Sequence, residues 1–219
     1  MASPVTPQFG GARRRLIEEL RGKGITDLSV LRAFDLVPRH QFVPTGVRHR
    51  AYEDAPLPIG NGQTISQPFV HATYLQILKL QGDEKVLEIG TGSGYETALL
   101  ASLCRHVHSI ERIRPLLETA RDALTACGAT NVSLMCGDGT LGWPEFAPYD
   151  AILVGAAAPE VPAPLLRQLS DGGRLLVPVG GREEQRLLII TRNGTSYEQR
   201  EVAPMRFVPL VGQHGWESA

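Results

Sequence analysis

From Lys85 onward, short apolar runs alternate with segments whose apolar residues recur every three or four positions. The short runs predict buried strands over residues 85–89, 107–110, 131–135, 151–154 and 174–179. The segments between them predict helices over residues 95–104, 115–127 and 163–169. We expect Gly128 to end the second helix and Asp171-Gly172-Gly173 to end the third. Alternating strands and helices with short connections predict an α/β fold with a doubly wound, mostly parallel sheet.

The pattern changes after the last of these strands. Residues 186–192 and 195–202 predict a hairpin around Asn193-Gly194, a pair that favours a type I′ turn. This hairpin would give the sheet an antiparallel edge. The segment 206–211, RFVPLV, predicts a final strand-like piece.

The first third of the chain is predicted to combine helices with a long loop. Helices are expected over about 12–22, after Thr26-Asp27, and from Pro68 to about Leu80. Residues 37–66 are rich in proline and glycine and lack periodicity, and a loop of that length is usually functional or disordered. We expect one domain over residues 1–219. Its predicted parts are N-terminal helices and an active-site loop (1–80), a cofactor-binding core (81–180), and a C-terminal hairpin with a substrate-facing strand (181–219).

Composition narrows the classes of protein. Of 219 residues, 42% are hydrophobic and 21% charged, which predicts a folded chain with a substantial core. The net charge of −1 argues against a general binder of nucleic acid or of membrane surfaces. No run approaches a membrane span or a secretion signal, and the three cysteines show neither disulfide nor metal-site spacing. We therefore expect a cytoplasmic protein without a metal. We also expect a monomer.

The segment EIGTGSGY (88–95) follows a predicted strand and opens a predicted helix. Its G-x-G-x-G spacing lets the backbone approach a ligand, but it matches neither the dinucleotide fingerprint nor a P-loop. Glu111 ends the next strand, where a carboxylate can accept hydrogen bonds from both hydroxyls of a ribose. Asp138 follows the third strand, within reach of an adenine edge. Taken singly, these features are equally consistent with a simple turn, a surface charge and a helix cap.

Taken together, they favour a nucleoside with a positive charge. Carboxylates would repel phosphates, so the pattern points to S-adenosyl-L-methionine, with Glu88 anchoring its amino group directly or through water. The residues predicted to bind this cofactor are Glu88, Gly90, Thr91, Gly92, Ser93, Gly94, Glu111, Asp138 and Gly139.

Four segments carry a more specific pattern. They read YEDAPLPIGNGQTISQP (52–68), VLEIGTGSGY (86–95), GDGTLGWPEFAPYDAILVGAAA (137–158) and RFVPL (206–210). In this order they resemble the protein-L-isoaspartate (D-aspartate) O-methyltransferase family, from about Arg13 to Leu210. The stretch TYLQ (73–76) and the tail after Leu210 depart from the family pattern.

The resemblance implies a class I S-adenosylmethionine-dependent methyltransferase with an N-terminal helical extension. It implies methylation of the free carboxylate of L-isoaspartyl residues in damaged proteins and peptides, which are then the partners. It implies that Ser66 is the active-site residue, and that Gln63, Thr64, Ile65 and His71 lie at the cofactor. Ile65 and Ser66 would also face the substrate.

The chemistry needs little beyond positioning. An α-carboxyl has a pKa of about 3.3–3.7 and is ionised at neutral pH, so no general base is required. Ser66 would then position the substrate by hydrogen bonding, although it is also placed to cap the helix that begins near Pro68. We expect main-chain groups near Val208 to pair with an extended peptide, over a short stretch because Pro209 has no N–H.

Two alternatives remain. One is a methyltransferase acting on another carboxylate, a small molecule or a nucleic acid. The segment LVGAAAP (153–159) holds none of the Asn/Asp-Pro-Pro-aromatic pattern typical of base methylation. The other alternative is a catalytically silent binding protein of the same fold, against which the glycine segment, Glu111, Asp138 and Ser66 count.

Overall fold

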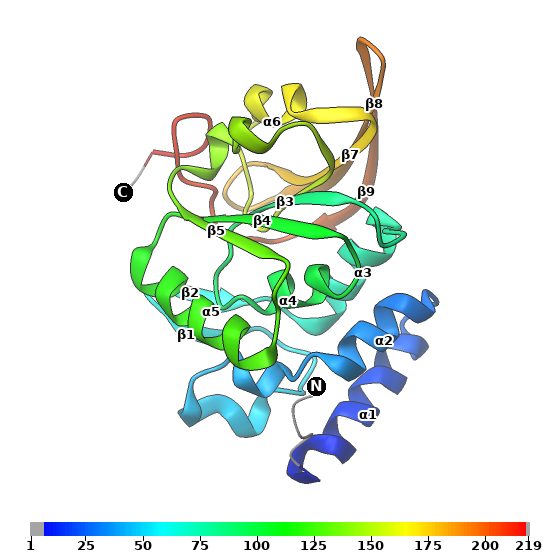
Figure 1. The fold of residues 1–219 in the computed structure, drawn as a ribbon, viewed down its shortest axis with the longest axis vertical. Helices are drawn as coiled ribbons and strands as arrows, with labels where there is room; N and C mark the ends of the chain where they lie inside the picture. The colour runs from blue at the N-terminus through cyan, green and yellow to red at the C-terminus, as the bar shows by residue number, and fades with distance from the viewer. Residues whose placement is uncertain (1–6, 218–219) are drawn as a thin grey trace.

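The computed structural model describes residues 7–217 and contains one large sheet of seven strands (Figure 1). Residues 1–6, within the stretch searched for a secretion signal, lie outside the described residues. The strand order is β5-β4-β3-β6-β7-β8-β9. The first five strands in this order are parallel, and β8 and β9 run antiparallel. The predicted fold class is therefore confirmed. The strands are β3 (Lys85–Ile89), β4 (His106–Glu111), β5 (Val132–Cys136), β6 (Tyr149–Val154), β7 (Leu169–Gly180), β8 (Gln185–Asn193) and β9 (Ser196–Met205).

Helices cover both faces of the sheet (Figure 1). One face packs on α3 (Pro68–Leu78), α4 (Tyr95–Ala101) and α5 (Arg114–Cys127), with α1 (Pro7–Gly22) and α2 (Leu28–Leu36) beyond them. The other face packs on α6 (Ala163–Arg167) and on the segment with the short 3-10 helices η3 (Gly139–Leu141) and η4 (Pro144–Phe146). Alternation along each strand divides the core between the faces, as with Val86 on the first and Leu87 on the second.

Several helix ends follow the sequence signals. Asp27 caps α2 by accepting hydrogen bonds from the backbone N–H groups of Ser29 and Val30. Gly128 ends α5 in a left-handed conformation, with φ of 80°. The first helix begins earlier than expected, at Pro7, and no described helix is long and apolar enough to cross a membrane.

The prediction that Asp171-Gly172-Gly173 ends a helix is wrong. Helix α6 ends at Arg167, and the three residues lie inside β7. The pairing of β6 with β7 shifts its register between Tyr149 and Ala151. Gly173 lies where a Cβ would come within 2.9 Å of the carbonyl oxygens of Ser170 and Tyr149. These glycines therefore allow a bulge in β7, where backbone atoms of Ser170 and Tyr149 lie too close for a side chain.

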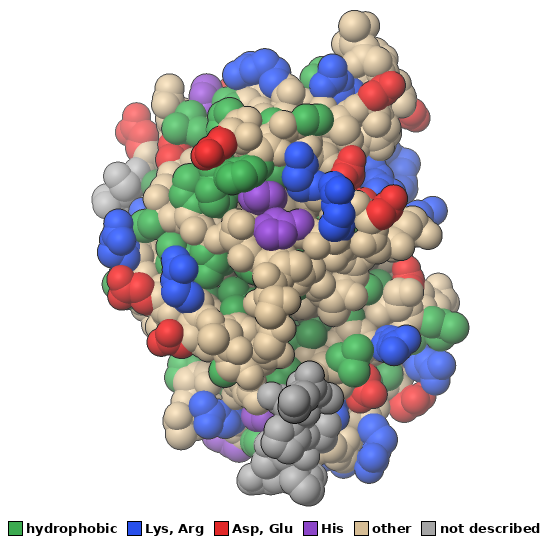
Figure 2. All heavy atoms as spheres, in the orientation of Figure 1, with side chains coloured by type: hydrophobic (Ala, Val, Ile, Leu, Met, Phe, Trp, Pro, Cys, Tyr) green, Lys and Arg blue, Asp and Glu red, His purple; other side chains and the backbone are tan. Residues whose placement is uncertain are grey.

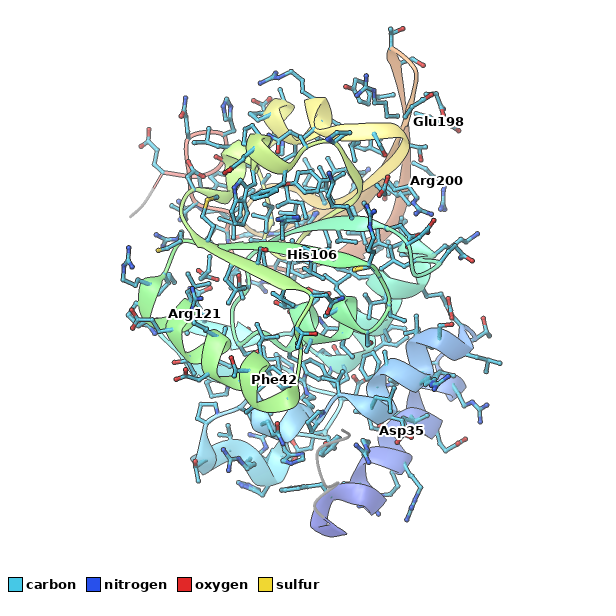
Figure 3. The ribbon with its side chains drawn as sticks, in the orientation of Figure 1. Asp35, Phe42, His106, Arg121, Glu198 and Arg200 are labelled. Atoms are coloured by element: carbon cyan, nitrogen blue, oxygen red, sulfur yellow. The ribbon has the colours of Figure 1, made fainter. Side chains whose placement is uncertain are left out.

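The C-terminal elements differ from prediction in two details. Asn193 pairs with Ser196, so the two-residue hairpin loop is Gly194-Thr195, one position later than expected. Residues 206–211 form no strand, and Pro209 makes only an isolated bridge with Ala157. The edge strand β9 carries exposed charges, and Figure 3 shows Glu198 and Arg200 pointing away from the sheet. Charged side chains on an edge strand discourage pairing with other chains.

The long loop at 37–66 is more ordered than its composition indicated. It contains the 3-10 helices η1 (Arg39–Gln41) and η2 (Thr45–Arg50), and the hairpin of β1 (Leu57–Gly60) and β2 (Gln63–Ile65). Asn61 and Gly62 turn this hairpin with φ of 51° and 69°. An Asn-Gly pair with two positive φ angles is the usual type I′ turn, so the sequence held a signal for this hairpin that we overlooked.

Candidate active site

A cleft opens at the carboxyl ends of β3 and β4, where ligands bind in open parallel sheets. Its walls enclose about 630 Å³, part of it open solvent. The residues that line the cleft are Ile59, Gln63, Thr64, Ile89, Gly90, Gly92, Ile110, Glu111, Arg112, Ile113, Leu116, Gly139, Gly155, Ala156, Val208, Pro209, Leu210 and Val211. Eight of the site residues predicted from the sequence are among them: Gln63, Thr64, Gly90, Gly92, Glu111, Gly139, Val208 and Pro209.

The glycine segment between β3 and α4 needs its glycines for two different reasons. Gly90 and Gly92 line the cleft in left-handed conformations, with φ of 98° and 53°. Gly94 does not line it. A Cβ on Gly94 would come within 3.2 Å of Ala120 Cβ, so this glycine lets α4 begin close against α5.

Glu111 ends β4 at the floor of the cleft. Its carboxylate oxygens accept hydrogen bonds from the backbone N–H groups of Gly92 and Ile113, both at 2.9 Å. An ionised carboxylate has about four acceptor positions, so each oxygen keeps one for a ligand. Glu111 thus joins the glycine segment to the cleft and presents a carboxylate to whatever occupies it.

Asp138 does not line the cleft, in contrast to prediction. One of its carboxylate oxygens accepts bonds from the N–H and hydroxyl of Thr140, and the other from the N–H of Gln213 at 2.8 Å. Burial alone would raise the pKa of Asp138, but these hydrogen bonds hold it below its ordinary value. Its neighbour Gly139 lines the cleft instead, pressed against Ile89 so closely that a Cβ would overlap that side chain.

Glu88 lies behind the glycine segment and does not reach the cleft. It is fully buried, and one oxygen accepts hydrogen bonds at 2.5 Å from the hydroxyls of Thr97 and Ser109. Burial, together with the charge of Glu96, raises the pKa of Glu88 to about 8. Thr91, also expected at the cofactor, bonds the hydroxyl of Ser109 instead. The direct anchoring role expected of Glu88 therefore does not fit its position.

Three other predicted cofactor residues also lie outside the cleft lining. Ser93 accepts a long hydrogen bond from the N–H of Tyr95, at 3.3 Å. Ile65 is 3% exposed and belongs to the core on the face of the sheet covered by α3, α4 and α5. His71 is buried, with Nδ1 3.0 Å from a carboxylate oxygen of Glu96.

A second cavity of about 520 Å³, part of it open solvent, adjoins the cleft. Thr64, Gly155 and Val208 line both spaces, so the two meet at a common wall. The second cavity is lined in addition by Pro56, Ser66, Gln67, Val70, Arg206 and Phe207. Arg206 belongs to a segment singled out from the sequence, but no role was predicted for it.

Ser66 is held by its backbone, not used as a helix cap. Its carbonyl accepts a hydrogen bond at 2.8 Å from the guanidinium of Arg39, which is fully buried over the ring of Tyr95. Burial lowers the pKa of Arg39 to about 10, still well above neutrality, so it remains a cation. The Ser66 hydroxyl makes no hydrogen bond within residues 7–217 and is available to a ligand in the second cavity.

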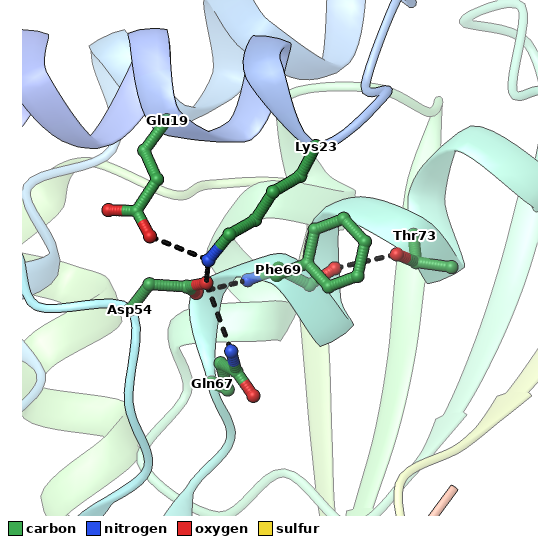
Figure 4. A network of polar contacts seen from close by, with 6 residues as sticks. All are labelled: Glu19, Lys23, Asp54, Gln67, Phe69 and Thr73. Carbon is green, nitrogen blue, oxygen red and sulfur yellow. Dashed lines mark hydrogen bonds and ion pairs between the residues drawn. The ribbon is translucent and has the colours of Figure 1, made fainter. Parts of the chain in front are cut away.

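The capping role considered for Ser66 belongs to Asp54. An Asp54 oxygen accepts the N–H of Phe69 in the first turn of α3 at 2.8 Å, and the other accepts from Gln67. Figure 4 shows the amino group of Lys23 between Glu19 and Asp54, at 2.6 and 2.5 Å. Helix α1 is therefore tied to the residues that follow Ser66.

The segment expected to pair with a peptide is partly used within the protein. The Val208 carbonyl accepts from the N–H of Ala157, and the Leu210 N–H donates to the Ala157 carbonyl, both at 2.8 Å. The tail beyond Leu210 contributes as well, since the indole of Trp216 donates to that same carbonyl at 3.0 Å. No role was predicted for this tail, although the N–H of Gln213 bonds Asp138 and Val211 lines the cleft.

The surface and the site have different charge patterns. On the face shown in Figure 2, acidic and basic side chains are interspersed, with no field of one sign. The cleft instead combines apolar walls with Glu111, and Arg112 is its only lysine or arginine among the described lining residues. Apolar walls with one carboxylate acceptor fit a nucleoside that has a positively charged substituent. Within residues 7–217, no three His, Cys, Asp or Glu side chains form a group that could hold a metal ion.

The sheet, the glycine segment and the carboxylate at the end of β4 define a class I methyltransferase. The chain matches the family model of protein-L-isoaspartate(D-aspartate) O-methyltransferase over residues 12–215. It belongs to this family.

Individual relatives agree. A protein-L-isoaspartate O-methyltransferase of Dictyoglomus thermophilum is 50% identical over 212 residues, covering 97% of this chain and 96% of the relative. One from Trichlorobacter lovleyi is 52% identical over 212 residues, covering 95% and 97%. A solved protein-L-isoaspartate O-methyltransferase superposes with a TM-score of 0.86 at 31% identity, over 93% of this chain and 67% of the other. A Plasmodium falciparum structure assigned to the same family superposes with a TM-score of 0.81 at 25% identity, over 91% and 98%, and holds S-adenosyl-L-homocysteine.

Proposed function

We propose that this chain transfers a methyl group from S-adenosyl-L-methionine to the free α-carboxylate of L-isoaspartyl residues in damaged proteins and peptides, with Ser66 at the point of transfer. The observation that carries the proposal is the common wall of the two cavities. A cofactor in the cleft and a peptide in the second cavity would meet at Thr64, Gly155 and Val208, with the Ser66 hydroxyl on the peptide side. Family membership and about 50% identity over nearly the whole chain support this activity.

When bound, the cofactor supplies a methyl group on a positively charged sulfur, and transfer breaks one carbon–sulfur bond and forms one carbon–oxygen bond. The substrate carboxylate is already ionised, so no residue of the chain must remove a proton. Glu111 holds the ribose hydroxyls with its two remaining acceptor positions. Gly90, Gly92 and Gly139 let the backbone approach the nucleoside, while Gln63 and Thr64 close the cleft above it.

Ser66 donates its hydroxyl to one carboxylate oxygen and so aims the other along the line of transfer. Arg39 fixes the backbone of Ser66, and Arg206 brings positive charge to the same cavity. Aligning the reacting atoms is worth roughly 7–11 kcal/mol in favourable cases. Positioning therefore accounts for most of what this site must do.

We also propose that one domain, present as a monomer in the cytoplasm, is the active form. The two apolar clusters lie on opposite faces of a single sheet, which supports one domain. Cys104, Cys127 and Cys136 are all free, as expected in a reducing compartment. Sedimentation at micromolar concentrations tests the monomer.

The activity is tested with synthetic peptides that differ only in one linkage, L-isoaspartyl or L-aspartyl. The isoaspartyl link leaves the α-carboxylate as a short branch, whereas ordinary aspartate presents its carboxylate one methylene further along a side chain. A misplacement of about 1 Å can cost on the order of 100-fold in rate. We expect rates on the isoaspartyl peptide to be higher by that order. Comparable rates would favour a general carboxyl methyltransferase, and binding of the cofactor without any transfer would indicate a silent protein of this fold.

A further inference from the structure

The second cavity carries charge of one sign only. Arg206 is the single charged side chain among the described residues that line it, and the others are apolar or neutral. A second cation lies behind the wall, where the buried guanidinium of Arg39 donates to the carbonyl of Ser66 at 2.8 Å. A ligand in this cavity therefore meets positive charge and no carboxylate of the lining.

The residue that follows Arg206 is fixed on both its backbone and its side chain. The N–H of Phe207 donates to Oε1 of the buried Gln185 at 2.7 Å. The ring of Phe207 stacks on that of Tyr74, with 5.6 Å between the centroids and 24° between the planes. Tyr74 belongs to the stretch TYLQ, which departs from the family pattern. These contacts hold the backbone that carries Arg206 against the second cavity.

The side chain of Arg206, in contrast, has no fixed partner. It is exposed and makes no hydrogen bond or ion pair within residues 7–217. Glu201, the nearest acidic residue before it in the chain, is paired with Arg186 at 3.1 Å. Asp54, which bonds the side chain of Gln67 at this cavity, is already engaged by Lys23. The Arg206 guanidinium can therefore turn toward an anion in the cavity without breaking another contact.

Methyl transfer to a carboxylate changes the charge of the group in this cavity. The substrate carboxylate carries one negative charge, and the methyl ester formed from it carries none. A guanidinium has five N–H donors and no acceptor, and hydrogen bonds between ionised partners are roughly twice as strong as neutral ones. A guanidinium at this place therefore binds the peptide more strongly before the transfer than after it.

We propose that Arg206 is a specificity residue that selects the ionised carboxylate of the substrate over the neutral methyl ester of the product. This inference rests on the proposed function for the identity of the reaction. Arg206 recruits the charged peptide, and the same contact weakens once the charge is gone, so the ester leaves more readily. Its role differs from that of Ser66, which aims one oxygen. Arg206 does not distinguish the linkage, because an L-aspartyl peptide carries the same charge.

The test is calorimetric binding of two peptides in the presence of S-adenosyl-L-homocysteine, which allows no turnover. One is an L-isoaspartyl peptide. The other has an α-carboxamide in place of the α-carboxylate, and this group is similar in size, neutral and stable. For Arg206→Gln we expect affinity for the carboxylate peptide to fall about 3- to 10-fold, between the values for an exposed ion pair and a charged hydrogen bond. Affinity for the carboxamide peptide should stay within about twofold.

Three comparisons make the result specific. Arg206→Lys keeps the charge and should keep most of the preference for the carboxylate. Arg200→Gln changes the net charge equally on β9, where the side chain points away from the sheet (Figure 3), and should alter neither affinity. In steady-state kinetics, Arg206→Gln should raise KM for the isoaspartyl peptide by the same factor without lowering kcat, because the contact weakens as the carboxylate loses its charge. Added salt should raise KM less for this variant than for the unchanged protein.

Equal losses of Arg206→Gln for both peptides, or no loss for either, would overturn the assignment of Arg206. A fall in kcat at an unchanged preference would also overturn it, because Arg206 would then align the carboxylate as Ser66 does. If the unchanged protein methylated no isoaspartyl peptide, the proposed function itself would fail. Thermal unfolding of each variant without ligand shows whether its fold is intact. If Arg206→Gln unfolds, the two peptides on the unchanged protein decide the matter, since equal affinity for both would contradict the proposal.

Discussion

The cleft and the second cavity are built from different lengths of chain. Most of the cleft comes from the ends of β3, β4 and β6 and the turns that follow them, with contributions from 59–64 and 208–211. The second cavity is formed almost entirely where residues 56–70 meet residues 206–208. Its parts are held by contacts between distant residues, such as Arg39 with Ser66 and Phe207 with Gln185. The cofactor side therefore depends on local turn geometry, and the substrate side depends on tertiary contacts.

The largest expected effect separates the two cavities directly. Ser66→Ala should lower kcat on an isoaspartyl peptide on the order of 100-fold, because the carboxylate loses its alignment. Affinity for S-adenosyl-L-homocysteine should remain unchanged, since Ser66 lines only the second cavity. Steady-state kinetics and calorimetry on the same preparation measure both quantities. Parallel losses of the two would mean that the cavities are not functionally separate.

Glu111→Ala is the complementary change on the cofactor side. It removes charge-assisted hydrogen bonds to the ribose, so binding of S-adenosyl-L-homocysteine should weaken by about 1.5–3 kcal/mol. The variant should also melt at lower temperature, because the N–H groups of Gly92 and Ile113 lose their acceptor. At saturating cofactor, KM for the peptide should be unaffected. Calorimetry that returned the original affinity would remove Glu111 from the site.

A pH dependence of stability tests the buried carboxylate behind the glycine segment. Below its ordinary pKa of 4.5, Glu88 is protonated in both the folded and the unfolded chain and contributes no slope. Between pH 4.5 and about 8 only the unfolded chain releases the proton, so the free energy of unfolding falls as pH rises, and above pH 8 the slope ends. The contribution is at most about 1.4 kcal/mol per pH unit. Urea unfolding from pH 5 to 8 should show a shallower decline for Glu88→Gln than for the unchanged protein, and identical profiles would contradict this account.

The smallest effect concerns the connection between α1 and the second cavity. Asp54→Ala removes the acceptor for the N–H of Phe69 and the partner of Lys23, and should cost about 1 kcal/mol of stability, as for a lost helix cap. KM for the peptide should rise, while affinity for S-adenosyl-L-homocysteine should not change. Lys23→Met, which removes only the exposed end of the pair, is the matched control and should cost less. A change confined to cofactor affinity would refute the connection.

The difference between local turn geometry and tertiary contacts also explains how much of the site could be predicted from the sequence. The glycine segment, Glu111 and the alternating strands and helices are local patterns, so their places could be read from spacing. Asp138 follows the third strand of the sequence pattern and Glu88 precedes the glycine segment, as expected. The side chain of Asp138, however, accepts a hydrogen bond from Gln213, and that of Glu88 accepts hydrogen bonds from Thr97 and Ser109. No local sequence pattern reveals these partners.

The substrate side shows the converse. Ser66 was found only through a family resemblance, because its neighbour Arg39 lies 27 residues away and reads as an ordinary surface cation. The cap on α3 comes from Asp54, 15 residues before the N–H that it accepts.

The common wall has a thermodynamic consequence for experiments on this chain. Thr64, Gly155 and Val208 contact whatever fills either cavity, and Val208 is fixed by its bond to Ala157. If an occupant on one side changes the position of this wall, it changes the affinity on the other side, and the two ligands must influence each other by the same factor. A substitution at Val208 therefore alters a linkage between two binding equilibria. Its effect is measured only by titrating each ligand in the absence and in the presence of the other.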